Sequence, residues 1–545
     1  MSKYLLLYIF IFLSFSFNTF AQRRKDIPPE KPKLIIGLVI EDMRYDYLTR
    51  FWDNFGKNGF KRLINEGTLC KDANYDYMLT QTAPGFATIA TGCNPVVHGI
   101  VSDYWYKRIK KLSTFAVFYD KVKTVGASKD IYPYAPVNIL TTTFTDELKL
   151  FNNGKSKVIG ISFNPEAAVL PVGHMGDAAY WFDDISGNWI TSTYYCDSLP
   201  VWVKNFNDKK FPDIYKERDW LPLLSKSDYH SGSKNGNSEN IGFSTENKFA
   251  RQITKFLRKD NYAVLRATPY GITLTKDFAI SAILNEDLGE DNYTDFISIG
   301  FASTAKVSES CGPNSVELED LYIRLDKELA HFLNFVDEQF GKKNVLIYLT
   351  SDHGSAYPPE ELTANRIPAG TFNADRAIML LRTYLNAVYD KGNWVTAYHN
   401  KQIYLNHTSI EDAGLKLNAV QDVVAQFIIQ FTGVANTVTS TTLEQSHFNT
   451  GIFSFIQNSY NQKRSGDIYI NLEPGWIEKG DYISTANSAN KYDRHVPLIW
   501  YGWKIKRAKI SRTIYIKDIA PTISNFIDIP FPNGCTGNII KELNN

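Results

Sequence analysis

Beyond its first 22 residues, this 545-residue chain lacks long hydrophobic runs, an excess of charge of one sign and paired cysteine motifs. No stable insertion in a membrane is expected, because a helical span needs about 20 mostly apolar residues. The 59 basic and 58 acidic residues nearly cancel and are interspersed, which gives no electrostatic footprint for nucleic acid. The five cysteines include no C-x-x-C pair, so they predict no zinc cluster and leave any disulfide pairing open.

The N-terminal segment has the pattern of a secretory signal. Lys3 provides a basic start, Tyr4–Phe17 is almost wholly apolar, and Ala21 ends a small-residue cleavage site. The apolar run is short for a transmembrane anchor. The sequence therefore predicts a signal peptide over residues 1–21 and an exported protein, periplasmic or extracellular, that consists of residues 22–545.

Short apolar runs alternate with helical patterns along the remaining chain. Four runs have the continuous hydrophobicity of buried parallel strands: Lys33–Asp42, Lys157–Ser162, Asp295–Phe301 and Val345–Leu349. Between two of them, Val316–Gly341 carries leucine and phenylalanine at helical spacing. This alternation predicts an α/β fold with a central, mostly parallel β-sheet covered by helices on both faces. Cap or loop insertions into this one domain are expected near 179–243 and near 364–466.

Groups able to carry chemistry stand at the carboxyl ends of three expected strands. Glu41 and Asp42 end the first run, and Asp352 and His353 follow the last one. The loop after Phe301 is the third position. Active groups of open α/β sheets gather at that edge. A carboxylate beside an imidazole can hold a metal ion, although a structural hydrogen-bonded pair explains Asp352 and His353 equally well.

Thr82 begins a segment that runs from a flexible loop into an apolar helix. A hydroxyl at such a position can act as a nucleophile, with the helix dipole favouring an anion in front of it. Taken alone, however, a threonine at the start of a helix is more often an N-cap.

Several short motifs occur in order between about residue 31 and the C-terminus. They include Thr82-Ala-x-Gly85, His98-Gly-Ile100, Leu170-Pro-x-Gly-His174, Asp352-His-Gly354 and Tyr492-Asp-x-His495. As a collinear set they resemble the exported, threonine-nucleophile bacterial alkaline phosphatases of the PafA type, in the superfamily that includes type I phosphodiesterases and nucleotide pyrophosphatases. The resemblance implies the alkaline phosphatase fold and a two-zinc site for phosphoryl transfer.

Carried over by that resemblance, one metal site is largely retained. Thr82 takes the nucleophile position, and Asp352 and His353 match a carboxylate and a histidine of the first metal. The aspartate position after the first strand falls on Glu41, with Asp42 beside it. The expected cofactor is therefore one divalent metal ion, zinc, held by Glu41, Asp42, Asp352 and His353.

The second metal site is expected to be absent. Its ligand positions fall on Ala305, Glu309 and Ala486, of which only Glu309 can bind a cation. Lys306 could place an ammonium group where that metal sat, but a solvated loop lysine is the simpler interpretation.

The phosphate clamp is altered as well. The asparagine, lysine and arginine that hold the phosphoryl oxygens in the family fall on Asp103, Asn164 and Glu166. A phosphate dianion would meet repulsion there instead of charge-assisted hydrogen bonds.

Two functions are therefore predicted. The first is an exported pseudophosphatase or binding protein, whose partner, a protein or a small molecule, the sequence does not name. The second is an active ester hydrolase that uses one metal and Thr82 as the nucleophile.

Overall fold

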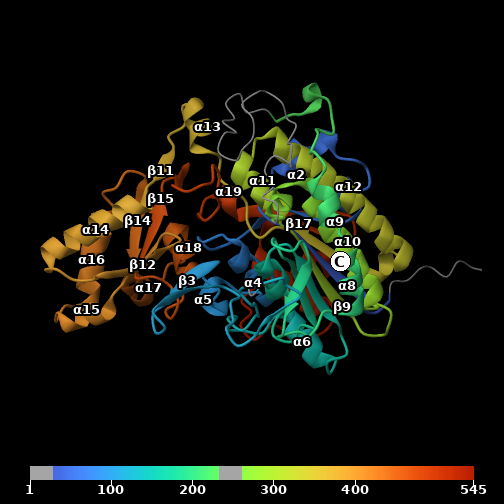
Figure 1. Ribbon diagram of the computed structural model, residues 1–545, viewed down its shortest axis with the longest axis horizontal. Helices are drawn as coiled ribbons and strands as arrows, with labels where there is room; N and C mark the ends of the chain where they lie inside the picture. The colour runs from blue at the N-terminus through green and yellow to red at the C-terminus, as the bar shows by residue number, and fades with distance from the viewer. Residues whose placement is uncertain (1–28, 130, 232–260, 545) are drawn as a thin grey trace, which may run out of the picture.

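The computed structural model describes residues 29–129, 131–231 and 261–544, so the expected signal peptide lies outside the described residues. Figure 1 shows a main lobe on the right and a small lobe (residues 370–478) on the left. In the described part of the chain, no helix combines the length and the apolar character that a membrane span needs.

Ten strands form the main sheet, in the order β18-β2-β17-β10-β1-β9-β6-β7-β8-β5. Five neighbours at its centre are parallel: β10 (Val345–Thr350), β1 (Leu34–Ile40), β9 (Asp295–Phe301), β6 (Val158–Ser162) and β7 (Ala178–Phe182). All of their residues are buried because helices cover both faces, which explains why these strands are mostly apolar. The other strands are β2 (Thr68–Asn74), β5 (Thr124–Val125), β8 (Trp189–Ser192), β17 (His495–Gly502) and β18 (Ala508–Tyr515).

Helices pack on the two faces through two hydrophobic cores. One core includes α2 (Tyr47–Arg50), α3 (Phe60–Glu66), α8 (Val201–Asp208), α10 (Pro269–Asn285), α11 (Ser303–Cys311) and α12 (Val316–Gln339). The other includes α4 (Thr82–Thr91), α6 (Phe144–Phe151), α7 (Pro165–Val169) and α20 (Ile519–Phe526). The predicted α/β fold, a mostly parallel sheet with helices on both faces, is confirmed.

The first expected insertion, near 179–243, starts inside the main sheet. Its first residues form β7 and β8, which extend the sheet beyond β6. Trp181 and Trp189, which belong to these strands, are only 2% and 1% exposed. The chain leaves the sheet after β8 and forms α8 and α9 (Phe211–Lys216). Residues 232–260 lie outside the described part.

The small lobe has its own hydrophobic core. Its sheet runs β12 (Val395–His399), β13 (Gln402–Leu405), β15 (Ile468–Leu472), β14 (Val434–Thr439). Its helices are α14 (Ala374–Val388), α15 (His407–Asp412), α16 (Leu417–Ile428), α17 (Ser440–Gln445) and α18 (Gly451–Ser459). The second expected insertion, near 364–466, covers most of this lobe and ends just before β15.

Short elements lie between the larger ones. They are α5 (Pro95–His98), β3 (Tyr104–Lys107), β4 (Leu112–Phe115), α13 (Pro359–Ala364), β11 (Gly370–Phe372), β16 (Trp476–Glu478) and α19 (Lys491–Arg494).

Candidate active site

The carboxyl ends of β1 and β10 bring predicted site residues to one edge of the main sheet. The two strands are parallel neighbours. Asp42 follows β1, and Asp352 and His353 follow β10. The backbone amides of Asp42 and His353 both donate to Asp352 Oδ1, at 2.9 and 2.8 Å. Asp352 is therefore fixed between the two strand ends.

The imidazole of His353 faces two buried carboxylates. Its Nε2 lies 3.4 Å from Asp352 Oδ2, and its Nδ1 lies 3.7 Å from Asp42 Oδ1 and 2.9 Å from the carbonyl oxygen of Gly354. Burial lowers the pKa of His353, but the two carboxylates outweigh it and hold the pKa well above its ordinary value. Burial raises the pKa of Asp352 above its ordinary value, and the nearby charge of His353 and the Thr82 hydroxyl offset part of that rise. Thr82 therefore lies beside Asp352.

The carboxylate of Glu41 is engaged elsewhere. Its Oε2 accepts a hydrogen bond from Asn164 Nδ2 at 2.5 Å, and its Oε1 lies 3.4 Å from the Ser162 hydroxyl. Arg266 holds Asn164 in turn, through a bond of 2.8 Å to Oδ1. Burial, and then the charge of Asp352, raise the pKa of Glu41 well above its ordinary value.

The four predicted metal ligands do not form a ready coordination group. In the part of the chain that the structure describes, no three His, Cys, Asp or Glu side chains are grouped so that they could hold a metal ion. Glu41 is bonded to Asn164, and one oxygen of Asp352 is taken by two backbone amides. The side chains as arranged therefore do not fit the expected ligand set, and a bound zinc ion stays a prediction.

The first turn of α4 carries Thr82 and already holds an anion. Gln81, not Thr82, is the N-cap, so the N-cap interpretation of Thr82 is wrong. Asp103 Oδ1 accepts a hydrogen bond from the Ala83 amide at 2.7 Å, and the Asp103 amide donates to Gln81 Oε1 at 3.0 Å. Amides at a helix N-terminus are an anion-binding position. Asp103 therefore occupies the Ala83 amide, a donor that an external anion beside Thr82 would otherwise use.

Two carboxyls of the altered clamp have raised pKa values. Burial raises the pKa of Asp103 to about 6. Burial, and then the charge of Asp103, raise the pKa of Glu166 to about 7. Burial and their mutual repulsion therefore make it unfavourable for Asp103 and Glu166 to be ionised together.

Lys306 and Glu309 form an ion pair on α11, at positions that the family resemblance assigned to the second metal region. Lys306 Nζ lies 2.8 Å from Glu309 Oε2. The carbonyl oxygen of Glu309 accepts from the amide of Ile483, which ties the loop that carries Ala486 to α11. Ala305, one turn earlier, is buried.

The ammonium group of Lys306 acts on several site carboxyls. It offsets part of the rise that burial causes in the pKa values of Glu41, Asp103 and Glu166. Lys306 is part of a helix and half-buried, so it does not behave as the solvated loop lysine that seemed simpler from the sequence.

Comparison with known proteins identifies the family. The profile of the type I phosphodiesterase / nucleotide pyrophosphatase family matches residues 35–496, which include the whole of this site. The chain belongs to this family. It is 37% identical over 528 residues to alkaline phosphatase PafA of Elizabethkingia meningoseptica, with 96% of both chains covered. It is also 37% identical over 534 residues to a Myroides odoratus protein named calcium-transporting ATPase, with 97% of both chains covered.

The crystal structure of wild-type PafA matches the fold of this phosphodiesterase-family chain with a TM-score of 0.88 at 35% identity, and covers 94% of this chain and 99% of PafA. A PafA variant with substitutions at a threonine, an asparagine, a lysine and an arginine matches equally well. The predicted resemblance to PafA and the predicted superfamily are therefore confirmed.

A hairpin of the small lobe forms part of this family member's site. β12 and β13 are joined through Asn400 and Lys401, whose φ angles of 50° and 61° are those of a tight two-residue turn. Asn400 Oδ1 accepts from Gln81 Nε2 at 3.0 Å, directly before Thr82. Lys401 is buried and donates to the carbonyl oxygen of Asn487 at 2.5 Å. The small lobe therefore contacts both the residue before the threonine and the loop that carries Asn487.

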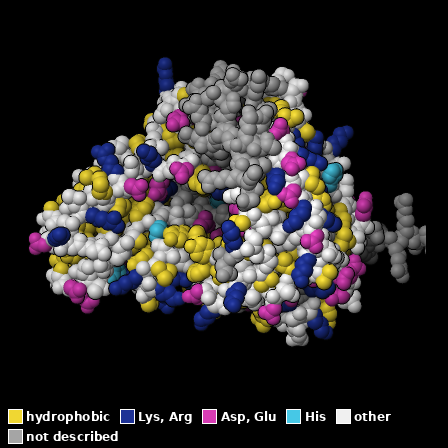
Figure 2. All heavy atoms as spheres, in the orientation of Figure 1, with side chains coloured by type: hydrophobic (Ala, Val, Ile, Leu, Met, Phe, Trp, Pro, Cys, Tyr) yellow, Lys and Arg dark blue, Asp and Glu magenta, His cyan; other side chains and the backbone are white. Residues whose placement is uncertain are grey.

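The phosphodiesterase-family site is accessible to solvent. Five of its side chains are half-buried: Thr82, Asp103, Asn164, Glu166 and Lys306. Figure 2 shows that this face of the molecule is hollowed between the two lobes, and that acidic side chains lie in the hollow.

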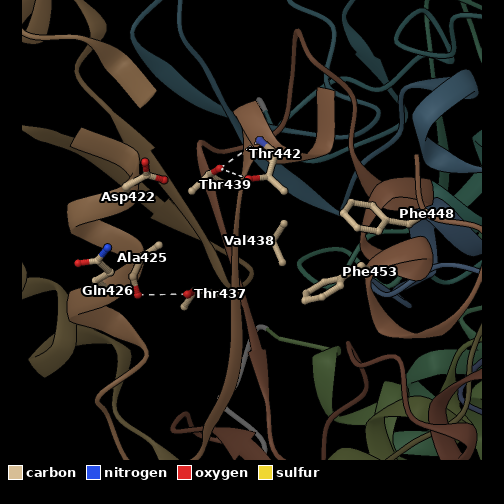
Figure 3. Close-up of a pocket in the computed structure, with 9 residues that line it drawn as sticks. All are labelled: Asp422, Ala425, Gln426, Thr437, Val438, Thr439, Thr442, Phe448 and Phe453. Carbon is tan, nitrogen blue, oxygen red and sulfur yellow. Dashed lines mark hydrogen bonds between the residues drawn. The ribbon is translucent and has the colours of Figure 1, made fainter. Parts of the chain in front are cut away.

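A second pocket, of about 210 Å³, lies in the small lobe between α16 and β14 (Figure 3). Phe448 and Phe453 line one side of it, and Asp422 and Gln426 line the other. Among its lining residues, Asp422 is the single titratable one. This pocket therefore offers much less chemistry than the family site.

Three charged residues near the site were not expected from the sequence: Arg266, Lys401 and Asp493. Burial raises the pKa of Asp493 to about 7, and its carboxylate bonds to the Ser488 hydroxyl at 2.5 Å. Asp493 could have been found, because it belongs to a motif that supports the resemblance. No sequence pattern marks Arg266 or Lys401 as part of the site, because each reaches it from a distant part of the chain.

Proposed function

We propose that this family member is an exported binding protein, a pseudophosphatase, whose Thr82 site does not turn over phosphate monoesters. The observation that carries the proposal is the bond of 2.7 Å from the Ala83 amide to Asp103. A carboxylate of the protein itself then occupies an anion-binding donor beside Thr82. The expected place of action is the periplasm or the extracellular space.

The charges around Thr82 oppose a phosphate dianion. Asp103 and Glu166 add negative charge when ionised, and the cations nearby are already engaged. Arg266 donates to Asn164 and to Asp184, at 2.8 and 2.7 Å. The loss of one oxyanion donor alone commonly costs about 2.7–4 kcal/mol of transition-state stabilisation. Turnover of a phosphate monoester should therefore be lower by many orders of magnitude than in an intact site.

The ligand that suits this pocket is neutral or carries a positive charge, because such a ligand gains from Asp103 and Glu166 instead of meeting repulsion. Whether it is a protein or a small molecule stays open. Nucleic acid is not proposed as a partner, and neither is a stable membrane insertion of the mature chain.

A second candidate, an ester hydrolase that uses one metal ion, zinc, and Thr82, is favoured by one observation. The Thr82 hydroxyl lies close enough to Asp352, beside His353, to act on the pKa of that carboxyl. Asp42 Oδ1 and Asp352 Oδ2 are buried and accept no hydrogen bond in the described structure. An ion would need Asp42, Asp352 and His353 to rearrange, because the described side chains do not form a coordination group.

The experiment is an assay of the purified full chain with an aryl phosphate, a phosphate diester and a sulfate ester, with added zinc and with a chelator. PafA serves as the active control, and Thr82→Ala as the inactive one. We expect the wild type and Thr82→Ala to show the same background rate. Brisk hydrolysis by the wild type that Thr82→Ala abolishes would reject the pseudophosphatase proposal, and its sensitivity to the chelator would support the single-metal hydrolase.

Restoring the family residues at the altered positions tests the reason for inactivity. The variant combines Glu41→Asp, Asp103→Asn, Asn164→Lys, Glu166→Arg, Ala305→Asp, Glu309→His and Ala486→His. Zinc-dependent hydrolysis that appears in this variant and again needs Thr82 would support decay of the site. The substituted PafA variant supports the choice of positions, because its four altered residue types are those that the resemblance assigns to 82, 103, 164 and 166.

A further inference from the structure

The end of α4 lies against the C-terminal segment of the chain. Gly92 ends the helix with φ 68°, and Cys93 follows it. The carbonyl oxygen of Gly92 accepts hydrogen bonds from the amides of Thr536 and Gly537, both at 2.9 Å. Cys93 thus directly follows the accepting carbonyl, and Cys535 directly precedes the first donating amide.

This hydrogen bond relates the two cysteines as a non-hydrogen-bonded pair is related in antiparallel strands. In such a pair the two Cα atoms are about 4.5 Å apart. Disulfides join residues whose Cα atoms are about 4.4–6.8 Å apart. The shared hydrogen bond therefore places Cys93 and Cys535 at facing positions of the two segments, where a disulfide would join them.

The positions of the side chains agree with the backbone pattern. A Cβ atom added at Gly92 would lie 2.8 Å from Cys535 Sγ, so this sulfur lies over the residue next to Cys93. Burial raises the pKa of Cys93 to about 11, and the nearby Cys535 thiol adds to the shift. The Cys93 thiol donates to the Thr91 hydroxyl at 3.3 Å, a weak bond that a disulfide would replace at little cost.

We propose that Cys93 and Cys535 form a disulfide bond that ties the C-terminal segment to the end of α4, the helix whose first residue is Thr82. The bond would close a loop of most of the chain and fix the C-terminal end of α4. It is independent of the proposed function.

The chemistry needs a two-electron oxidant, for which a disulfide such as oxidised glutathione suffices. Cys535 is half-exposed and Cys93 is buried, so the Cys535 thiolate attacks the oxidant first and releases one glutathione thiol. Cys93, deprotonated, then attacks the mixed disulfide at the Cys535 sulfur and releases the second glutathione. The two cysteines lose two protons and two electrons, and the oxidant becomes two thiols.

The test uses the purified, folded full chain, treated with oxidised glutathione, blocked with an alkylating agent and digested without reduction. We expect one crosslinked peptide that contains Cys93 and Cys535 and loses its link on reduction. We also expect the melting temperature of the oxidised chain to be higher by a few degrees than that of the reduced chain. No variant is needed, so misfolding cannot obscure the result.

Two variants sharpen the test. Cys535→Ser should remove the crosslinked peptide and the difference between the oxidised and reduced melting temperatures. Cys196→Ser, which alters a half-buried cysteine after β8, should retain both. Alkylation of both Cys93 and Cys535 in the oxidised chain, or a link from either one to another cysteine, would overturn the proposal.

Discussion

The contact between Asp103 and the Ala83 amide places a carboxylate at the first turn of α4, next to Thr82. A carboxylate there uses one helix amide and adds a negative charge close to the position of an incoming anion. Two unit charges 4 Å apart interact by roughly 4 kcal/mol at an effective dielectric constant of 20, more than an ordinary hydrogen bond contributes. Residue 103 therefore decides whether the first turn of α4 accepts an external anion.

Asp103→Asn should strengthen the binding of orthophosphate by about tenfold or more, because the substitution removes a charge and nearly keeps the shape. Titration calorimetry with orthophosphate measures the effect. Asp120→Asn is the matched control, since the side chain of Asp120 is 57% exposed and should not affect the affinity. Equal affinities for Asp103→Asn and the parent would contradict the blocking role of Asp103.

Glu166→Gln should change the pH dependence of stability. The folded pKa of Glu166 is about 7, raised from an ordinary value of 4.5. The fold therefore favours the protonated form, and the destabilisation is absent below about pH 4.5 and fully developed above about pH 7. The melting temperature of Glu166→Gln should exceed that of the parent at pH 8, and the difference should vanish near pH 4.5. Glu217→Gln, at an exposed position, should show no such trend.

Site residues could be predicted from the sequence where they are neighbours at the end of one strand. Asp352 and His353 are neighbours in sequence, so their proximity needed no tertiary information. The direction of Glu41 could not be predicted, because it depends on Asn164 and on Arg266, which approach from β6 and from a segment before α10.

At the scale of elements, continuous hydrophobicity predicted the four parallel strands that carry the site. β17 was not predicted, and its sequence explains why: it contains Pro497, and proline normally argues against a central strand. The structure accommodates Pro497 through a register shift between Val496 and Leu498. Its carbonyl oxygen still accepts from the Thr350 hydroxyl at 2.8 Å.

The buried His98 at the end of α5 should make the attachment of α4 sensitive to acid. Its Nε2 bonds to the Thr88 hydroxyl at 3.1 Å, and its Nδ1 accepts from the Ile100 amide. Burial, and then the charge of Arg464, lower the pKa of His98 to about 3. A depressed histidine pKa contributes stability that is present above pH 6.5 and is lost as the pH falls below it.

His98→Gln should therefore lose less stability on acidification than the parent. Between pH 6.5 and 3, protonation of His98 in the unfolded chain costs the parent about 1.4 kcal/mol for each pH unit, and the variant is free of that cost. Urea denaturation at pH 7, 6 and 5 measures the free energy of unfolding. Parallel pH curves for the two proteins would show that His98 does not contribute.

At the scale of the whole molecule, the two lobes are joined by charged groups. Asp467, buried at the start of β15, accepts bonds from Arg108 at 2.9 Å and from His407 at 2.7 Å. Burial raises the pKa of Asp467, but His407 and Arg108 outweigh it and keep the pKa below its ordinary value. The stability contributed by Asp467 is present at neutral pH and is lost as the pH falls through its folded pKa.

Asp467→Ala should lower the free energy of unfolding by about 3–5 kcal/mol, because it leaves Arg108 without its buried partner. Hydrogen exchange followed by mass spectrometry should show faster exchange in the small lobe, including β13, whose Leu405 amide also donates to Asp467. Asp412→Ala alters an exposed carboxylate of α15 and should change neither quantity. Unchanged exchange in Asp467→Ala would show that other contacts hold the lobes together.

The position of β17 sets the order in which the main sheet can be completed. β2 emerges early in synthesis, but both of its neighbours in the sheet, β17 and β18, come from residues 495–515. Until then β2 and β10 lack the strand that joins them, and each exposes an unpaired edge of the kind that promotes aggregation. A ribosome must therefore deliver nearly the whole polypeptide before the scaffold can close, and a chain interrupted upstream of β17 would be a substrate for chaperones and proteases.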